Sequence, residues 1–83
     1  QREIRDWEPR VAVFAGESGL EFYQRLAAEA PRVLRPEGWL VMELGFTASR
    51  PVAGMLAAGG WREIRVTPDL AGIPRVAAAR RAP

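Results

Sequence analysis

The sequence contains no cysteine and no histidine, and all 12 of its basic residues are arginine. These absences exclude disulfides, thiolate or imidazole metal ligands, and Ser-His or Cys-His nucleophilic pairs from this chain. The sequence also lacks an apolar run of the roughly 20 residues that span a membrane, and it opens without a signal-peptide pattern. We therefore expect a cytoplasmic location, no membrane partner and no metal site.

The residues that are present are typical of a globular segment. Of the 83 residues, 48% are hydrophobic, and eight Gly and seven Pro interrupt the chain. A chain of this length forms one domain or part of one. The net charge is only +2, and the arginines are dispersed except for the adjacent pair Arg80 and Arg81. A surface that follows nucleic-acid phosphates needs a clustered basic stripe, so we expect no direct binding of nucleic acid.

The first half of the chain predicts one long helix after a charged loop. Residues 1–17 are interpreted as a loop, although their apolar run VAVFAG could also be a short strand. Ser18 and Glu21 have the spacing of a capping box, which predicts the start of a helix over residues 18–35. Apolar residues then recur every three or four positions, while Pro31 must bend or break the last turns. The members of this apolar stripe are Phe22, Tyr23, Leu26, Ala27, Ala30, Val33 and Leu34.

The second half of the chain predicts an α/β arrangement. The run WLVMELGF predicts a strand over residues 39–46 that is apolar on both faces, which is typical of a parallel strand covered on both sides by helices. A helix over residues 48–59 follows, because its apolar residues form one inner face and two glycines end it. Alternation and flanking breakers then predict a terminal antiparallel pair of strands over residues 61–67 and 76–80.

Several blocks of the sequence resemble, in the same order, the blocks of one known family. Glu8-Pro9 matches an acidic segment that follows the Asn-Pro-Pro-Tyr motif of that family. AGESGLEFY matches its Gly-Gly-x-Asp-Gly-Leu-x-Phe-Tyr element, with Ser18 in place of the Asp. LRPEGWLVMELG matches its Leu-Lys-Pro-Gly-Gly-Trp-Leu block and the Leu-Glu-Ile-Gly-like strand that follows, and Asp69 to Arg75 matches a closing loop. The chain thus resembles the C-terminal part of the HemK/PrmC family, the methyltransferases that modify the Gln of the Gly-Gly-Gln motif in peptide-chain release factors.

This resemblance implies the C-terminal half of a Rossmann-like class I methyltransferase fold. Residues 1–83 would be a segment of the catalytic domain that supplies the fifth to seventh strands, the last one antiparallel, and two helices. The resemblance implies S-adenosylmethionine as the cofactor and a release factor as the partner of the full-length enzyme. The family's cofactor and active-site motifs are not among these 83 residues, so the segment itself is expected to bind no cofactor and to be inactive.

Two carboxylates are candidates for a place near the substrate pocket, although no catalytic residue is expected in this segment. Glu43 lies toward the carboxyl end of the predicted central strand, where open α/β sheets bind ligands. It either braces the substrate loop or forms an ion pair with an arginine such as Arg5 or Arg50. Glu8 follows the active-site motif in the resembling family, and it either borders the Gln pocket or pairs with Arg5 or Arg10.

Two further predictions concern packing and association. Trp39 and Trp61 each begin a predicted strand, where large aromatic residues usually seal a core, and we do not interpret them as base-stacking platforms. Without an upstream neighbour, residues 39–45 would form a strand edge with unpaired N–H and C=O groups, which recruit other chains. We therefore expect the isolated segment to self-associate through this edge or to be poorly soluble.

Two other classes of function remain open from the sequence. One is a different methyltransferase of the Asn-Pro-Pro-Tyr type that acts on nucleic acid. The other is a small binding module without catalytic activity, which would have a complete sheet with protected edges.

Overall fold

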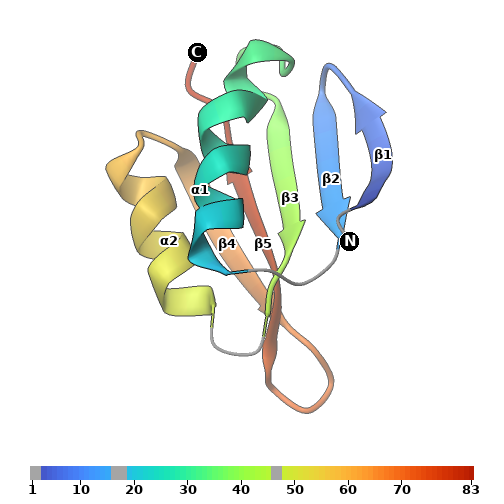
Figure 1. The fold of residues 1–83 in the computed structure, drawn as a ribbon, viewed down its shortest axis with the longest axis vertical. Coiled ribbons are helices and arrows are strands. Elements are labelled where there is room, and N and C mark those ends of the chain that lie inside the picture. The colour runs from blue at the N-terminus through green and yellow to red at the C-terminus, as the bar shows by residue number, and fades with distance from the viewer. Residues whose placement is uncertain (1–2, 16–18, 46–47) are drawn as a thin grey trace.

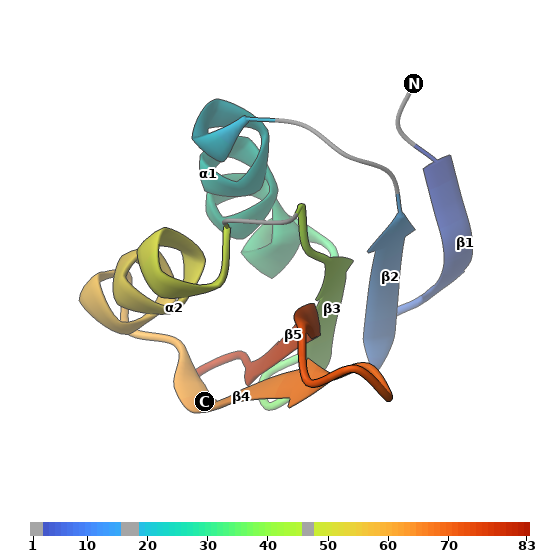
Figure 2. The same cartoon turned by 90° about the horizontal axis from the view of Figure 1, so that it is seen from below.

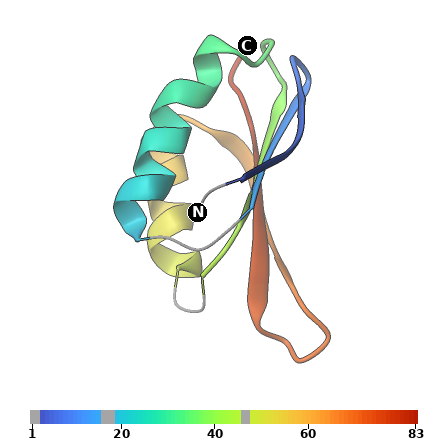
Figure 3. The ribbon, with the colours of Figure 1, turned by 45° about the vertical axis from the view of Figure 1, so that its right-hand side comes forward.

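The computed structural model describes residues 3–15, 19–45 and 48–83. Within these ranges, two α-helices and one short 3-10 helix pack on one face of a five-stranded sheet (Figures 1 and 3). The elements are β1 (Glu3–Glu8), β2 (Val11–Ala15), α1 (Leu20–Glu29), the 3-10 helix η1 (Ala30–Arg32), β3 (Trp39–Glu43), α2 (Ser49–Ala58), β4 (Arg62–Pro68) and β5 (Pro74–Arg80).

The predicted α/β class and the order of the elements after the first helix are confirmed. The strands lie in the order β1-β2-β3-β5-β4. β5 runs antiparallel to both β3 and β4, so β3 and β4 point the same way with the last strand inserted between them. Helix α2 connects β3 to β4, and Figure 2 shows it beside α1 on the same side of the sheet. An antiparallel last strand is what the resemblance implied.

The interpretation of residues 1–17 as a loop is wrong for the part of that segment that the structure describes. β1 and β2 form an antiparallel hairpin, with Glu8 opposite Val11. β2 also pairs in parallel with β3, from Val11 opposite Trp39 to Phe14 opposite Met42. The short apolar run is therefore a strand because β3 offers its main chain a partner.

The central strand β3 differs from the prediction in two ways. β2 pairs with one of its edges and β5 with the other, so the expected open edge over residues 39–45 is absent from the described residues. The premise of the predicted self-association is therefore wrong, because the hydrogen-bonding groups of this edge are used within the chain, and self-association itself stays a prediction. Both helices also lie on the same face of the sheet, so β3 is not covered by helices on both sides (Figure 3).

The helix boundaries follow local chemistry. α1 begins at Leu20 and ends at Glu29, which makes it shorter than the predicted 18–35. Its N-cap is Gly19, without a side-chain hydrogen bond, and Ser18 lies outside the described residues. The last predicted turns tighten into the 3-10 helix that contains Pro31, as the missing amide of proline requires. Neither described helix is long and apolar enough to cross a membrane.

The core lies between the two helices and one face of the sheet. Trp61 is buried there with 8% of its surface exposed, which confirms that prediction. Trp39 is only half-buried on the opposite face, so the prediction that it seals the core is wrong. The side-chain alternation of β3 explains the difference, because its even-numbered residues face the helices. The buried apolar residues are Ala12, Phe22, Tyr23, Ala30, Leu34, Leu40, Met42, Leu44, Val52, Leu56, Trp61, Ala77 and Ala79.

Candidate functional site

The candidate site lies at the carboxyl end of β3. β2 and β3 are parallel, so both strands end at the same end of the sheet, which we call the carboxyl edge. The loop between β4 and β5 lies at the carboxyl edge too (Figure 1). In open α/β sheets, ligands bind outside the carboxyl ends of the parallel strands. The same edge also contains the beginning of α1, which follows β2 in the chain.

Tyr23 fixes the main chain where β3 ends. Its side chain is fully buried, and its hydroxyl donates a hydrogen bond to the carbonyl oxygen of Glu43 at 3.1 Å. The same hydroxyl accepts a hydrogen bond from the Gly45 N–H at 2.9 Å. Tyr23 comes from α1, so a helix residue holds the two sides of the turn that leaves the strand. This hydroxyl thus both donates to and accepts from the main chain of that turn.

Sequence reasoning missed this role of Tyr23. The spacing of Tyr23 places it on the buried face of α1 and indicates only a member of the apolar stripe. A buried tyrosine hydroxyl usually finds a hydrogen-bond partner, and that rule was the available signal. The partners are main-chain atoms 20 and 22 residues away in the sequence, so their identity could not be read from the sequence.

Glu43 lies at the carboxyl end of β3, as predicted, although the strand ends at this residue and not at residue 46. The surroundings of its side chain differ from the prediction. Its side chain is half-buried and points to the face opposite the helices, whereas Met42 and Leu44 on either side of it are buried in the core. The carboxylate is therefore not enclosed among apolar side chains. Its main-chain carbonyl is the group that Tyr23 bonds. Of the two arginines named as ion-pair partners, Arg50 is exposed in the first turn of α2, and the side chain of Arg5 is not described.

The loop between β4 and β5 is held by Asp69. Its carboxylate accepts hydrogen bonds from the N–H groups of Ala71 at 2.8 Å and Ile73 at 3.0 Å. It also accepts one from the Nε of Arg75 at 2.9 Å. The side-chain bond from Arg75, followed by the main-chain bond from Ile73, lowers the pKa of Asp69 below its usual 3.8. Gly72 completes the loop with a φ of +84°, a conformation that favours glycine.

This loop is tied to the end of the central strand. The N–H of Leu44 donates to the carbonyl oxygen of Arg75 at 2.8 Å, one step beyond the paired residues Glu43 and Val76. The block from Asp69 to Arg75 that carried part of the resemblance is therefore a loop closed by its own aspartate. This loop therefore lies beside the carboxyl end of β3, where the candidate site is.

The structure does not bring the two predicted carboxylates together. Glu8 is the last residue of β1 and lies opposite Val11, the first residue of β2. Its main chain is therefore at the amino end of β2 and β3, whereas Glu43 is at the carboxyl end. The side chain of Glu8 is outside the described part of the structure. Across the described ranges, no group of three or more acidic side chains is placed to hold a metal ion.

The candidate site supplies shape and fixed main-chain groups. The Tyr23 hydroxyl and the Asp69 carboxylate are both engaged in hydrogen bonds within the chain. Such an edge can hold a neighbouring loop or substrate in one geometry, which is the contribution that positioning makes to catalysis. Glu43 is the one predicted side chain that the structure places at this edge.

Comparisons with known proteins point to a single activity name. No protein-family model matches the chain. A release factor glutamine methyltransferase from Koribacter versatilis is 42% identical over 81 residues, which are 98% of this chain and 28% of that protein. The protein of the same name from Cereibacter sphaeroides is 44% identical over 78 residues, which are 94% of this chain and 28% of its own length. The chain thus spans about 28% of the length of these curated relatives.

A solved structure agrees with these relatives. The crystal structure of a release factor-specific protein-(glutamine-N5) methyltransferase from Alicyclobacillus acidocaldarius superposes with a TM-score of 0.61 at 39% sequence identity. The match covers 78% of this chain and 42% of that one. The resemblance predicted from the sequence blocks is confirmed: over nearly its whole length, this chain is similar to part of the release factor glutamine methyltransferases.

Proposed function

We propose that this chain is a C-terminal segment of the catalytic domain of a methyltransferase that methylates the side-chain amide of a glutamine in a release factor. The observation that carries the proposal is the identity of 42% and 44% to proteins of that name over nearly the whole chain. The arrangement of β3, β4 and an inserted antiparallel β5 supports it. The release factor is the proposed partner, and the cytoplasm is the proposed location.

The candidate site suits the positioning that this reaction needs. An amide nitrogen is a poor nucleophile, so the reaction depends on its alignment and on acceptors for its hydrogens. We assign to Tyr23 the role of a positioning residue that fixes the turn between Glu43 and Gly45. Glu43 then braces the neighbouring substrate loop from the end of β3. A histidine or cysteine is not required for this work.

We expect the cofactor to be bound by parts of the enzyme outside these 83 residues. S-adenosylmethionine would supply the methyl group when it is bound. The described residues at the carboxyl edge do not fit it, since the Asp69 carboxylate is used within its own loop and Gly45 has no neighbouring glycine. We therefore expect no binding of S-adenosylmethionine to the 83-residue chain in an equilibrium titration. Saturable binding in the micromolar range would contradict this assignment.

A chimeric enzyme tests the proposed function. The segment of the Alicyclobacillus acidocaldarius enzyme that aligns with this chain would be replaced by residues 1–83, and the product assayed by mass spectrometry on a release factor. We expect one methyl group on the glutamine amide. The control is the unmodified enzyme, and the chimera with Glu43→Gln should methylate more slowly.

Three outcomes would contradict the proposal or part of it. A folded chimera that binds S-adenosylmethionine but leaves the release factor unmethylated would overturn the assignment of this segment. Methylation of DNA or RNA in place of the release factor would favour the nucleic-acid methyltransferase. If Glu43→Gln left the methylation rate of the chimera unchanged, only the bracing role of Glu43 would be contradicted.

One observation keeps the small binding module as a second candidate. Both edges of β3 are paired within the chain, as a self-contained domain requires. β1 and β4 nevertheless remain as sheet edges, so the described sheet is not closed. An inactive chimera combined with a stable, monomeric 83-residue chain would favour this second candidate.

A further inference from the structure

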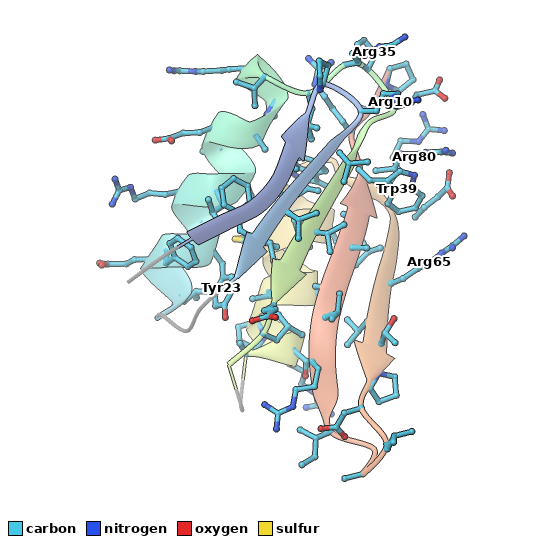
Figure 4. The ribbon with its side chains drawn as sticks, turned by 90° about the vertical axis from the view of Figure 1, so that its right-hand side faces the viewer. Arg10, Tyr23, Arg35, Trp39, Arg65 and Arg80 are labelled. Atoms are coloured by element: carbon cyan, nitrogen blue, oxygen red, sulfur yellow. The ribbon has the colours of Figure 1, made fainter. Side chains whose placement is uncertain are left out.

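A depression at the amino ends of β2 and β3 is not used by the proposed function. It has a volume of about 510 Å³, and it lies at the end of the sheet opposite the candidate site. Figure 4 shows Arg10, Arg35, Arg80 and Trp39 at this end and Tyr23 at the other. We call this feature the amino-end depression, and the residues that matter for its chemistry are Arg10, Arg35, Glu37, Gly38, Trp39 and Arg80.

The three arginines come from three separate parts of the chain. Arg10 is in the turn between β1 and β2, Arg35 is in the turn before β3, and Arg80 ends β5. Glu37 lies in the same lining, and Glu63 outside it accepts a hydrogen bond from Arg80, so the three arginines exceed these two carboxylates by one charge. Arg35 is exposed, and its side chain has no hydrogen bond or ion pair with the described residues.

Main-chain hydrogen bonds hold the walls of the amino-end depression in place. The Arg35 N–H donates to the Pro9 carbonyl at 2.6 Å, and the Trp39 N–H donates to the Arg10 carbonyl at 2.8 Å. Gly38 lies so close to this turn that a Cβ would meet the carbonyl oxygens of Arg35, Arg10 and Pro9 at 3.0 to 3.2 Å. The turns that carry Arg10 and Arg35 are therefore locked together before any ligand binds.

Arg80 is oriented by its neighbours and retains an unused donor. Its guanidinium carbon lies 4.9 Å from the centre of the Trp39 ring, and its Nη1 donates to Glu63 at 3.0 Å. Its Nε is buried and has no hydrogen-bond partner among the described residues. A buried donor without an acceptor costs free energy, so a ligand oxygen that reached this group would be favoured.

We propose that the amino-end depression binds the phosphate group of a small phosphorylated ligand. Guanidinium groups match phosphate oxygens through paired N–H donors, and Arg35, beside Arg10 and Arg80, offers such a pair to a group that carries about two negative charges at neutral pH. A single carboxylate has two oxygens and one charge, which would leave part of this lining unsatisfied. A nucleic-acid backbone needs a long basic stripe, whereas here Glu37 and Glu63 lie beside the arginines.

Calorimetric titration of inorganic phosphate and pyrophosphate into the 83-residue chain tests this site at constant ionic strength. We expect saturable binding of both probes, with pyrophosphate the tighter, and no saturable binding of acetate. Arg35→Gln should weaken binding by about tenfold or more, because it removes one charge-assisted pair of hydrogen bonds. Arg25→Gln is the matched control, since Arg25 is an exposed arginine on α1 outside the depression and the charge change is the same.

Any of three results would overturn the proposal. Absence of saturable binding means that the depression is not a phosphate site. Equal weakening by Arg35→Gln and Arg25→Gln means that the chain attracts anions only through its net charge. Binding of single-stranded RNA that pyrophosphate does not displace means that the ligand is a nucleic acid. Chemical-shift changes at the main-chain N–H of Gly38 and Trp39 would report the same site independently of affinity.

Discussion

The two ends of β3 satisfy their polar groups in different ways. At the carboxyl end, the Tyr23 hydroxyl and the Asp69 carboxylate bond main-chain atoms of the same chain. At the amino end, Arg35 and the Nε of Arg80 have no partner among the described residues, although the main chain around them is fully tied. An end whose groups bond internally contributes fixed shape, whereas an end with unused donors contributes affinity for an anion.

The largest expected effect on this contrast comes from removing the Tyr23 hydroxyl. Tyr23→Phe keeps the ring but leaves the Gly45 N–H and the Glu43 carbonyl without their partner. We expect a loss of about 2 kcal/mol in the free energy of unfolding. Each kcal/mol corresponds to roughly 4–8 °C in the melting temperature of a domain of this size. Thermal unfolding followed by circular dichroism would measure the shift.

A matched change at the neighbouring aromatic residue separates the hydroxyl from the ring. Phe22→Leu trims the buried ring that packs against Tyr23, with ring centroids 5.6 Å apart, and it leaves the Tyr23 hydroxyl in place. If Tyr23→Phe melted within about a degree of the wild type, the contrast between the two ends of β3 would be lost.

The next largest effect is expected at Gly38, where the amino end is locked. Gly38→Ala places a Cβ against three carbonyl oxygens at 3.0 to 3.2 Å, which should cost about 1–2 kcal/mol through shifts of the two turns. Gly54→Ala is the control, because no atom lies within 4 Å of a Cβ there and the residue is in α2. The control should be neutral or stabilise the chain by about 0.5–1 kcal/mol. Equal denaturation midpoints for the two variants would show that the turns are not locked.

A smaller effect is expected from the aromatic ring that orients the arginines. Trp39→Leu removes the ring beneath Arg80, at 4.9 Å, and Arg65, at 5.5 Å. Each such contact is worth about 0.5–1 kcal/mol at an exposed site, so the unfolding free energy should fall by about 1 kcal/mol. Trp39→Phe keeps a ring face and should retain more of this stability. Identical unfolding curves for Trp39→Leu and Trp39→Phe would show that the contacts between the ring and the arginines do not stabilise the fold.

The smallest effect concerns the pH dependence of the β4–β5 loop. Since the folded pKa of Asp69 lies below its unfolded value of 3.8, this carboxylate stabilises the fold above that pH. The contribution is lost as the pH falls through the lower folded value. Asp69→Asn should therefore melt slightly below the wild type at neutral pH, and the two curves should converge in acid. A gap that persisted unchanged in acid would assign it to something other than this charge.

The local elements of the fold were within reach of the sequence. The three- and four-residue spacing of apolar positions predicted α1, and Pro31 predicted the place where it tightens into a 3-10 helix. The terminal antiparallel pair was predicted by alternation and breakers. These features depend mainly on residues that are close together in the sequence, so a local pattern is enough to predict them.

The features that the sequence did not reveal depend on distant partners. β2 is a strand because β3 accepts it, and five apolar residues alone do not distinguish a strand from a packed loop. The two apolar faces of β3 did not show that both helices lie on the same side. Arg10, Arg35 and Arg80 appear dispersed in the sequence and converge only through the sheet.

Amide hydrogen exchange along β3 of the 83-residue chain tests the central claim most directly, namely that this chain pairs both edges of the strand and fixes its carboxyl end through Tyr23. We predict slow exchange at every amide from Trp39 to Gly45, with Gly45 alone strongly accelerated in Tyr23→Phe. Fast exchange at alternate residues of Trp39 to Glu43 would instead reveal an open edge and contradict the account.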